Sequence, residues 1–264
     1  MHPSDILFWP SGNRLGLWTF AGREIGRFLK VPVQTVLAPA LNTLLFCVVF
    51  FVIMQHGARQ IHGVDVLTFL APGLVMMAVA QNAFANTSSS LILSKMQTNI
   101  TDVLMAPLSA ADLLAGFALG GVVRGLVVGA ATIVALLPLV VMPSAQPGLA
   151  LAHLLLGSAF LALLGLASGI WADKFDQLAA INNFVVMPAT FLSGTFFTLE
   201  QLPAEWRWLC LGNPFFYMID GFRQGVLGHG DSDPALGLFI MLTVTLALGF
   251  LCWRMLATGY KLRG

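Results

Sequence analysis

Long apolar runs separated by short polar stretches are the feature that most limits what this chain can fold into. Six runs occupy residues 33–54, 67–91, 113–138, 149–171, 178–192 and 236–256. A helix needs about 20 apolar residues to cross the hydrocarbon core of a bilayer, and all but the fifth run provide them. Only 9% of the 264 residues are charged, against roughly 25% in a soluble domain. We therefore expect an all-α membrane protein, a single domain over residues 1–264 with six transmembrane helices in 33–264.

The fifth run is too short to cross a bilayer by itself. Its 15 or so residues reach roughly 22 Å at about 1.5 Å per residue. Pro188 lies inside it, Ser193 and Gly194 end it, and aromatic residues follow as far as Tyr217. Non-helical backbone at membrane depth survives only against protein or a water-filled cavity. We expect a helix that stops short of the outer face, followed by a re-entrant outer segment.

Two further segments have the pattern of helices at the membrane surface. Residues 1–32 are basic and amphipathic, with Trp18, Phe20 and Phe28 among Arg23, Glu24, Arg27 and Lys30, which is typical of an interfacial helix. The polar break at 93–109 has an apolar face at helical spacing: Met96, Ile100, Val103 and Leu104. Its other face is polar: Lys95, Gln97, Thr98, Asn99 and Asp102. This pattern favours an amphipathic helix that is pushed by a cytoplasmic partner over an ordinary solvated loop.

The basic residues indicate which side of the membrane each loop occupies. With both chain ends on one side, nine Lys and Arg residues lie on that side, three lie on the other, and Arg124 lies within a run. Cytoplasmic loops carry the excess of positive charge. Both termini and the 93–109 break are therefore expected in the cytoplasm.

Arg124 is the exceptional residue of the membrane-spanning runs. It lies about 11 residues into the third run, roughly 16 Å deep, where an arginine is costly and often functional. Gln81, Asn82 and Asn86 on the second run fall at a similar depth. Arg124 is either satisfied by these amides, or faces a cavity and attracts an anionic headgroup.

Other polar and aromatic residues are candidates for a path or for helix contacts. Asn42, Asn182 and Asn183 either join helices at a subunit contact or line a cavity. Phe46, Phe84 and Phe184 favour a lipid or an amphiphile as substrate. The glycines between Gly116 and Gly129 recur at steps suited to close helix packing.

Several classes of function lack their sequence signals. There is no glycine-rich phosphate-binding loop for ATP, the three cysteines have no metal-ligand spacing, and a net charge of +1 gives no reason to expect nucleic acid. An ion-coupled secondary transporter stays open as an alternative, although such proteins place acidic residues at mid-membrane. A membrane assembly scaffold is a second alternative.

Four short motifs resemble one known family. They are Leu-Met-Ala-Pro-Leu-Ser at 104–109, Phe-Leu-Ser-Gly-Thr-Phe-Phe at 191–197, Leu-Gly-Asn-Pro-Phe at 211–215 and Asp-Gly-Phe-Arg at 220–223. With the four motifs in this order along the chain, the sequence resembles, over essentially its whole length, the permease subunits of type-2 ABC exporters. This family includes nodulation, daunorubicin and O-antigen exporters.

The resemblance implies a homodimer in the bacterial inner membrane, joined along the first and fifth spans. Two copies of a separate ATPase would bind ATP and Mg, so this chain would have no cofactor, metal or enzymatic activity of its own. Residues 95–104 would be the coupling helix, with Arg23 and Glu24 in a second helix that touches the ATPase. The candidate residues of the substrate path are Arg124, Asn42, Phe46, Gln81, Asn82, Asn86, Asn183 and Phe184. The outer gate would include Phe196, Phe197, Asn213, Phe215 and Tyr217.

Overall fold

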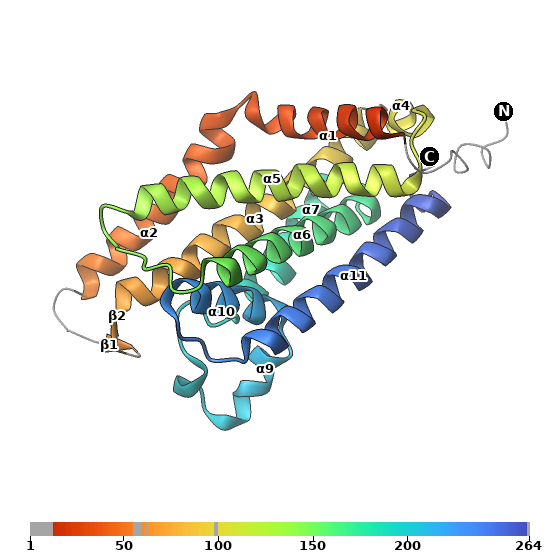
Figure 1. Ribbon diagram of the computed structural model, residues 1–264. Helices are drawn as coiled ribbons and strands as arrows, with labels where there is room; N and C mark the ends of the chain where they lie inside the picture. The colour runs from red at the N-terminus through yellow and green to blue at the C-terminus, as the bar shows by residue number, and fades with distance from the viewer. Residues whose placement is uncertain (1–12, 55–59, 62, 98–99, 263–264) are drawn as a thin grey trace.

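The fold is an elongated bundle of helices with one very small hairpin. The computed structural model describes residues 13–54, 60–61, 63–97 and 100–262. β1 (Gln60–Ile61) and β2 (Val64–Asp65) form the antiparallel hairpin at one end of the bundle, seen in Figure 1. The helical regions are α1 (Arg14–Leu29), η2 (Val33–Leu37), α2 (Ala38–Met54), α3 (Val66–Met96), α4 (Ile100–Met105), α5 (Ala110–Leu136), α6 (Pro147–Trp171), α7 (Phe175–Ile181), η3 (Asn182–Val186), α8 (Met187–Phe191), η4 (Leu199–Gln201), η5 (Ala204–Trp206), α9 (Arg207–Leu211), α10 (Pro214–Leu227) and α11 (Pro234–Thr258).

Five of the described helices are long and apolar enough to cross a membrane: η2 with α2, α3, α5, α6 and α11. They match five of the six expected spans, and an all-α membrane protein is confirmed. The remaining span is the short one. It is built from α7, η3 and α8, which follow one another without a break and have 7, 5 and 5 residues. This composite helix, which we call the α7–α8 stack, is shorter than each of the other five spans, as its short apolar run led us to expect.

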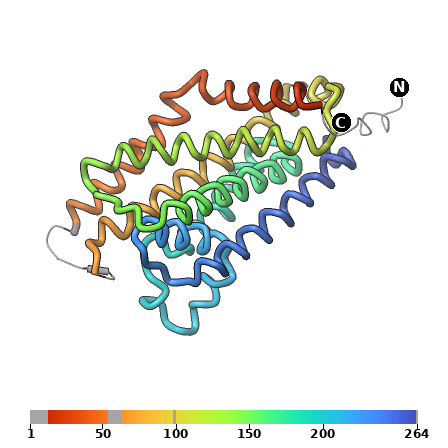
Figure 2. Tube along the Cα trace, in the orientation of Figure 1, coloured from red at the N-terminus to blue at the C-terminus, as the bar shows by residue number. Residues whose placement is uncertain are grey.

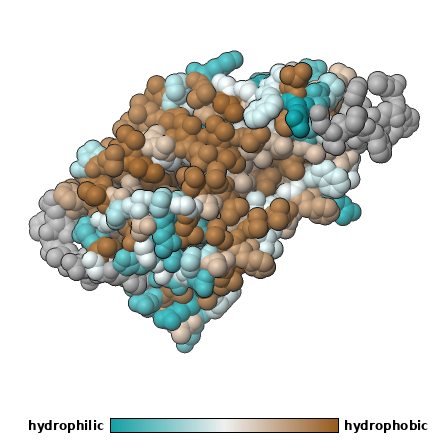
Figure 3. All heavy atoms as spheres, in the orientation of Figure 1, coloured by the Kyte–Doolittle hydropathy of each residue, from teal (hydrophilic) through white to brown (hydrophobic). Residues whose placement is uncertain are grey.

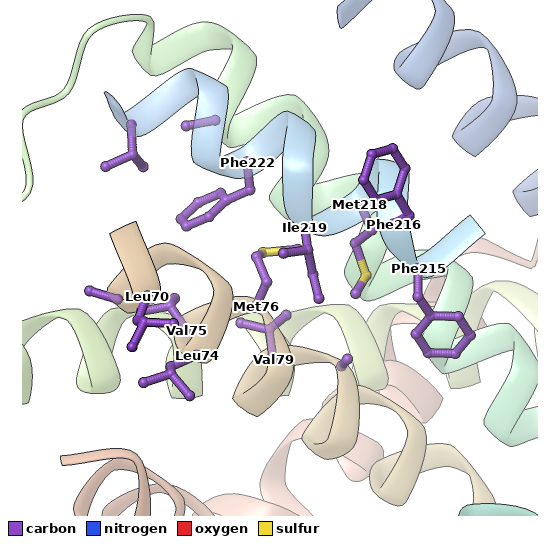
Figure 4. Packing of buried hydrophobic residues seen from close by; sticks show 14 of the residues in the cluster. Leu70, Leu74, Val75, Met76, Val79, Phe215, Phe216, Met218, Ile219 and Phe222 are labelled. Atoms are coloured by element: carbon purple, nitrogen blue, oxygen red, sulfur yellow. The ribbon is translucent and has the colours of Figure 1, made fainter. Parts of the chain in front are cut away.

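α3 is the central element of the bundle. In its most apolar stretch 83% of the residues are buried, against 17% for α2 and for α11. Met76 of α3 lies beside Ile219 of α10, as Figure 4 shows, and Leu74 and Val79 belong to the same hydrophobic cluster as Phe215 and Phe222. Burying apolar side chains between these helices is what holds the outer segment onto the bundle.

The glycines of α5 let its neighbours approach closely. An added Cβ at Gly116 would lie 2.3 Å from the Phe20 ring of α1, and one at Gly121 would lie 2.5 Å from Ala162 of α6. Gly129 meets Val79 of α3 at 2.9 Å. The packing interpretation of these glycines is confirmed, and it explains how one helix contacts three others.

Two helices widen into π-helix shortly before a proline. η2 precedes Pro39, and η3 precedes Pro188. A proline ring clashes with the carbonyl four residues earlier and has no N–H to donate, so the preceding turn opens. Such π turns are rare and occur often at functional sites. Both lie in helices that expose much of their surface.

The two ends of the bundle differ in charge. α1, α4, the end of α6 and the end of α11 lie at one end, which we call the basic end (Figures 1 and 2). Most of the Lys and Arg residues belong to these elements or to the turns beside them. α9 and the hairpin lie towards the opposite end, the outer end. Between hydrophilic patches, Figure 3 shows a broad hydrophobic surface. Such a surface matches the hydrocarbon core of a bilayer.

One expected element has different bounds. The helix predicted over residues 95–104 is divided: Lys95 and Met96 form the last turn of α3, and α4 begins at Ile100. The prediction was wrong at this boundary because α3 continues past its apolar run. Thr98 and Asn99, predicted within that helix, lie outside the described residues.

Candidate functional site

A groove follows the half of α3 that is nearer the basic end. Its volume is about 520 Å³, and α7 with the start of η3 forms its second wall. Polar residues line it within an otherwise apolar part of the bundle: Gln81, Asn82, Ser88, Ser89, Asp176 and Asn182. Phe84 and Phe175 contribute aromatic surface. We call this cavity the α3 groove. Its mixture of amides, hydroxyls and apolar surface suits an amphipathic molecule.

Arg124 is joined to this groove by one hydrogen bond. Its Nη2 donates to Asn82 Oδ1 at 3.0 Å, and Asn82 Nδ2 donates to Ala78 O within α3. The predicted meeting of Arg124 with the amides of α3 is therefore confirmed for Asn82. Gln81 instead donates to Met187 Sδ of α8 at 3.1 Å, which holds the α7–α8 stack against α3.

The third amide, Asn86, serves a different helix. Arg27 of α1 donates from Nη2 to both Asn86 O and Asn86 Oδ1, and from Nη1 to Ser89 Oγ at 3.2 Å. Asn86 is fully buried and does not line the groove. It ties the amphipathic helix α1 to α3 instead. The sequence showed Arg27 only as one charge of an amphipathic pattern.

The remaining path candidates lie on the outer surface of the single chain. Phe184 is 81% exposed on η3, and Asn183 is exposed beside it. Asn42 and Phe46 are exposed on α2. These two helices carry amides on lipid-facing or partner-facing surfaces, whereas Phe84 alone of the predicted phenylalanines lines the groove.

Lys95 is held inside the protein at the basic end. Its Nζ donates to Ile170 O and Ala172 O, both at 2.8 Å, and lies 3.7 Å from Asp173. It thereby satisfies carbonyls at the C-terminus of α6, where a positive charge is favourable. Lys261 donates to Asp173 Oδ2 at 2.9 Å, and this hydrogen bond lowers the pKa of the Asp173 carboxyl.

α4 has a packed face and an open face. Val103 is buried, and Ile100 and Leu104 pack with it into a cluster that includes Phe20 and Phe117. Asp102 and Met105 are exposed, and so are Met96 and Gln97 on the preceding turn. The open face therefore offers one acid and two methionines to a partner. Ser109 and Asp112 then form a capping box that starts α5.

α1 is fixed beside α4. Asn13 caps α1 by accepting from Gly16 N, and its Nδ2 donates to Pro107 O at 3.1 Å. Glu24, predicted as a contact for an ATPase, is only 1% exposed, because it faces α5 at Gly120. It pairs with Arg23 at 3.0 Å and Arg27 at 3.7 Å. Arg23 keeps 49% of its side chain exposed.

The outer-gate candidates divide into a stack and a support. Phe196 stacks between Phe50 of α2 and Phe191 of α8, with ring centroids 5.7 and 5.6 Å apart, and Phe197 packs beside this core. The supporting residues are Asn213, which is half-buried, and the buried Phe215 and Tyr217. Asn213 donates to Ala189 O at 2.6 Å and caps α10, Phe215 meets Phe160, and Tyr217 OH donates to Leu211 O at 2.9 Å.

Asp220 and Arg223 of the outer segment were named from the sequence only as parts of a motif, with no role predicted for either. Arg223 is buried under Phe69, 4.0 Å from its ring centroid, and its Nη2 donates to Gly194 O at 2.7 Å. Asp220, also buried, accepts from Asp231 N, Ser232 N and Ser232 Oγ. The charged pair within an apolar motif at 220–223 was the available signal. These residues fasten α10 to the chain before and after it.

Comparison with known proteins decides the family. The ABC-2 type transporter family matches residues 16–227. The chain belongs to this family. It is 34% identical over 259 residues to the inner membrane transport permease YadH of Escherichia coli K12, which covers 97% of this chain and 98% of that protein. Nodulation protein J of Rhizobium leguminosarum bv. trifolii is 32% identical over 107 residues, or 39% of this chain and 40% of that protein.

Family membership and the five long apolar helices agree with one another. The chain is a multi-pass membrane protein and the permease subunit of an ABC transporter. The resemblance deduced from the motifs at 104–109, 191–197, 211–215 and 220–223 is thereby confirmed. A permease subunit of this family is not itself the catalytic ATPase.

Proposed function

We propose that the chain is the permease of an ATP-driven exporter in the bacterial inner membrane. Two copies would form the substrate path, and two copies of a separate ATPase that binds ATP and Mg would drive it. The excess of basic residues at the end with α1 and α4 supports placing that end, and both termini, in the cytoplasm. Membrane lipids surround the remaining apolar surface.

The observation that carries this proposal is the two-sided form of α4. Its packed face joins it to α1, α5 and the bundle, while Asp102 and Met105 stay exposed. A helix seated in this way transmits a push on its open face to the helices behind it. When the ATPases close around ATP, α4 and α1 would move together, because Asn13 joins α1 to Pro107. The energy of the partner then shifts a two-state interface between the copies.

The α3 groove is our candidate for the entry of the substrate. It lies on the face of α3 beside α7 and the start of η3, in the half of the bundle nearer the basic end, which we place in the inner half of the membrane. Its polar lining would receive a headgroup, and Phe84 and Phe175 would contact an apolar tail. This composition favours a lipid, a lipid-linked saccharide or an amphipathic drug. The Phe50, Phe196 and Phe191 stack would close the path on the outer side.

The test is co-purification with the partner ATPase, which we expect to be encoded in a neighbouring gene. We expect Asp102→Lys and Met105→Asp each to weaken binding of the ATPase to the detergent-solubilised permease about tenfold, and so to reduce the amount of ATPase retained. A tenfold loss of affinity corresponds to roughly 1.4 kcal/mol of binding free energy. Glu205→Lys, an exposed acid at the outer end, is the matched control and should retain the ATPase. Equal retention by all variants would refute α4 as the docking element.

A further inference from the structure

A second cavity lies between α1 and the end of α3, outside the groove described above. Its volume is about 470 Å³. Arg23, Arg27 and Lys30 of α1 line one side, and Ser90, Ser94 and Gln97 of α3 line the other. Lys30 and Arg23 are exposed, so the cavity opens at the surface. We call it the basic cavity.

The charge around this cavity is unbalanced. Three positive side chains share one carboxylate, that of Glu24, which also lines the cavity. Glu24 contacts Arg23 and Arg27 but, within the described residues, no ion pair involves Lys30. Arg124 of α5 lies near enough to Arg27 for their two positive charges to interact. The cluster therefore attracts an anion.

Two glycines keep the cavity open. An added Cβ at Gly22 or Gly26 would meet no atom within 4 Å, and both residues line the cavity. A glycine inside a helix costs about 1 kcal/mol relative to alanine. At Gly116 or Gly121 close packing accounts for that cost, because a Cβ would clash there. At Gly22 and Gly26 no packing contact within this chain accounts for that cost, and the missing side chains leave space beside the basic residues.

The position of the cavity indicates which anions it meets. α1 carries the exposed apolar side chains of Leu15, Trp18 and Leu29, as expected of a helix in the headgroup layer. The cytoplasmic leaflet is rich in anionic lipids, and basic pockets between helices on that side bind their headgroups. Guanidinium groups and serine hydroxyls are good donors to phosphate oxygens.

We propose that the basic cavity binds the phosphate group of an anionic phospholipid of the inner leaflet. The lipid would lie between α1 and α3, with its phosphate at Arg23, Arg27 and Lys30 and its acyl chains in the bilayer. The bound lipid would add to the contacts by which Arg27 holds α1 on α3. The inference does not depend on which substrate is transported or on the ATPase.

The experiment uses the full-length chain, purified in detergent and exchanged into excess phosphatidylcholine containing a minor fraction of phosphatidylglycerol. Native mass spectrometry counts the retained lipids. Wild type should retain one phosphatidylglycerol per chain in preference to phosphatidylcholine. Gly26→Leu should weaken that retention about tenfold because it fills the cavity without changing charge. Lys30→Gln should weaken it about tenfold because it removes a charge-assisted contact.

Matched controls exist for both variants. Gly148→Leu places the same side chain at another open glycine, and Lys174→Gln removes another exposed lysine; both should retain the lipid as wild type does. Equal retention by Gly26→Leu, Lys30→Gln and wild type would overturn the proposal. A competition experiment shows whether the site binds a lipid or only a phosphate ion. If added anionic lipid displaces the bound phosphatidylglycerol and inorganic phosphate does not, the proposal is supported. If inorganic phosphate displaces it equally well, the site is not specific for a lipid and that part of the proposal is overturned.

Discussion

The guanidinium of Arg124 is held by an amide instead of a carboxylate. Its described hydrogen bond goes to Asn82, whereas Glu24, the acid on α1, pairs with Arg23 and Arg27. An arginine at membrane depth costs several kcal/mol unless it is paired or hydrated. Because Asn82 also lines the α3 groove, the charge of Arg124 lies one hydrogen bond behind the groove wall. Arg124 therefore lies between the α3 groove and the polar cluster at α1.

Gly165 is a residue whose replacement we expect to damage helix packing. A Cβ there would lie 2.3 Å from Phe84 O and 2.4 Å from Thr87 Oγ1, and a backbone carbonyl cannot rotate away. Overpacking of this kind costs about 1–3 kcal/mol. Gly165→Ala should therefore lower the thermal unfolding midpoint of the detergent-solubilised protein. Gly148→Ala, at an open glycine of the same helix, should not, and equal midpoints would contradict the argument.

Among the helices, Lys95 joins the end of α3 to the end of α6. Lys95→Met would leave the carbonyls of Ile170 and Ala172 without their charged donor. Hydrogen bonds to charged groups are worth about 1.5–3 kcal/mol. We expect a lower unfolding midpoint for Lys95→Met, while Asp102→Ala keeps the wild-type midpoint because Asp102 is exposed. A midpoint unchanged by Lys95→Met would show that the α6 carbonyls do not need Lys95.

The sequence was enough to predict where the helices lie along the chain, but not which side chains meet between helices. Apolar runs predicted all the long helices, because a bilayer requires about 20 apolar residues whatever the neighbours are. Side-chain partners depend on which helix faces which, and a pattern along one helix does not contain that. Glu24 therefore looked like a surface charge although it is buried against Gly120, and Lys95 looked like part of α4 although it caps α6. Asn82 was predictable because depth alone matched it to Arg124.

For the whole molecule, the exposed surfaces of the outer helices are unequal. α11 exposes Phe239, Leu246 and Phe250 and carries no amide side chain, as a helix facing lipid acyl chains would. α2 and η3 expose Asn42 and Asn183 among apolar residues. Amides at membrane depth are stabilised by contact with another helix. The surface that includes α2 and η3 is therefore where a second copy would bind.

The copies of a twofold dimer bring the same residue together near their axis, so a cysteine on the shared face can form a disulfide with itself. Phe184, 81% exposed on η3, is the position to use, and Phe239, 67% exposed on α11, is its matched control. The three native cysteines are buried and stay in place. In oxidised membranes Phe184→Cys should give a covalent dimer and Phe239→Cys should stay monomeric. A dimer formed equally by both, or only by Phe239→Cys, would contradict a subunit contact at η3. Asn183 would then face lipid, where an amide without a partner is costly, and another helix would have to cover it.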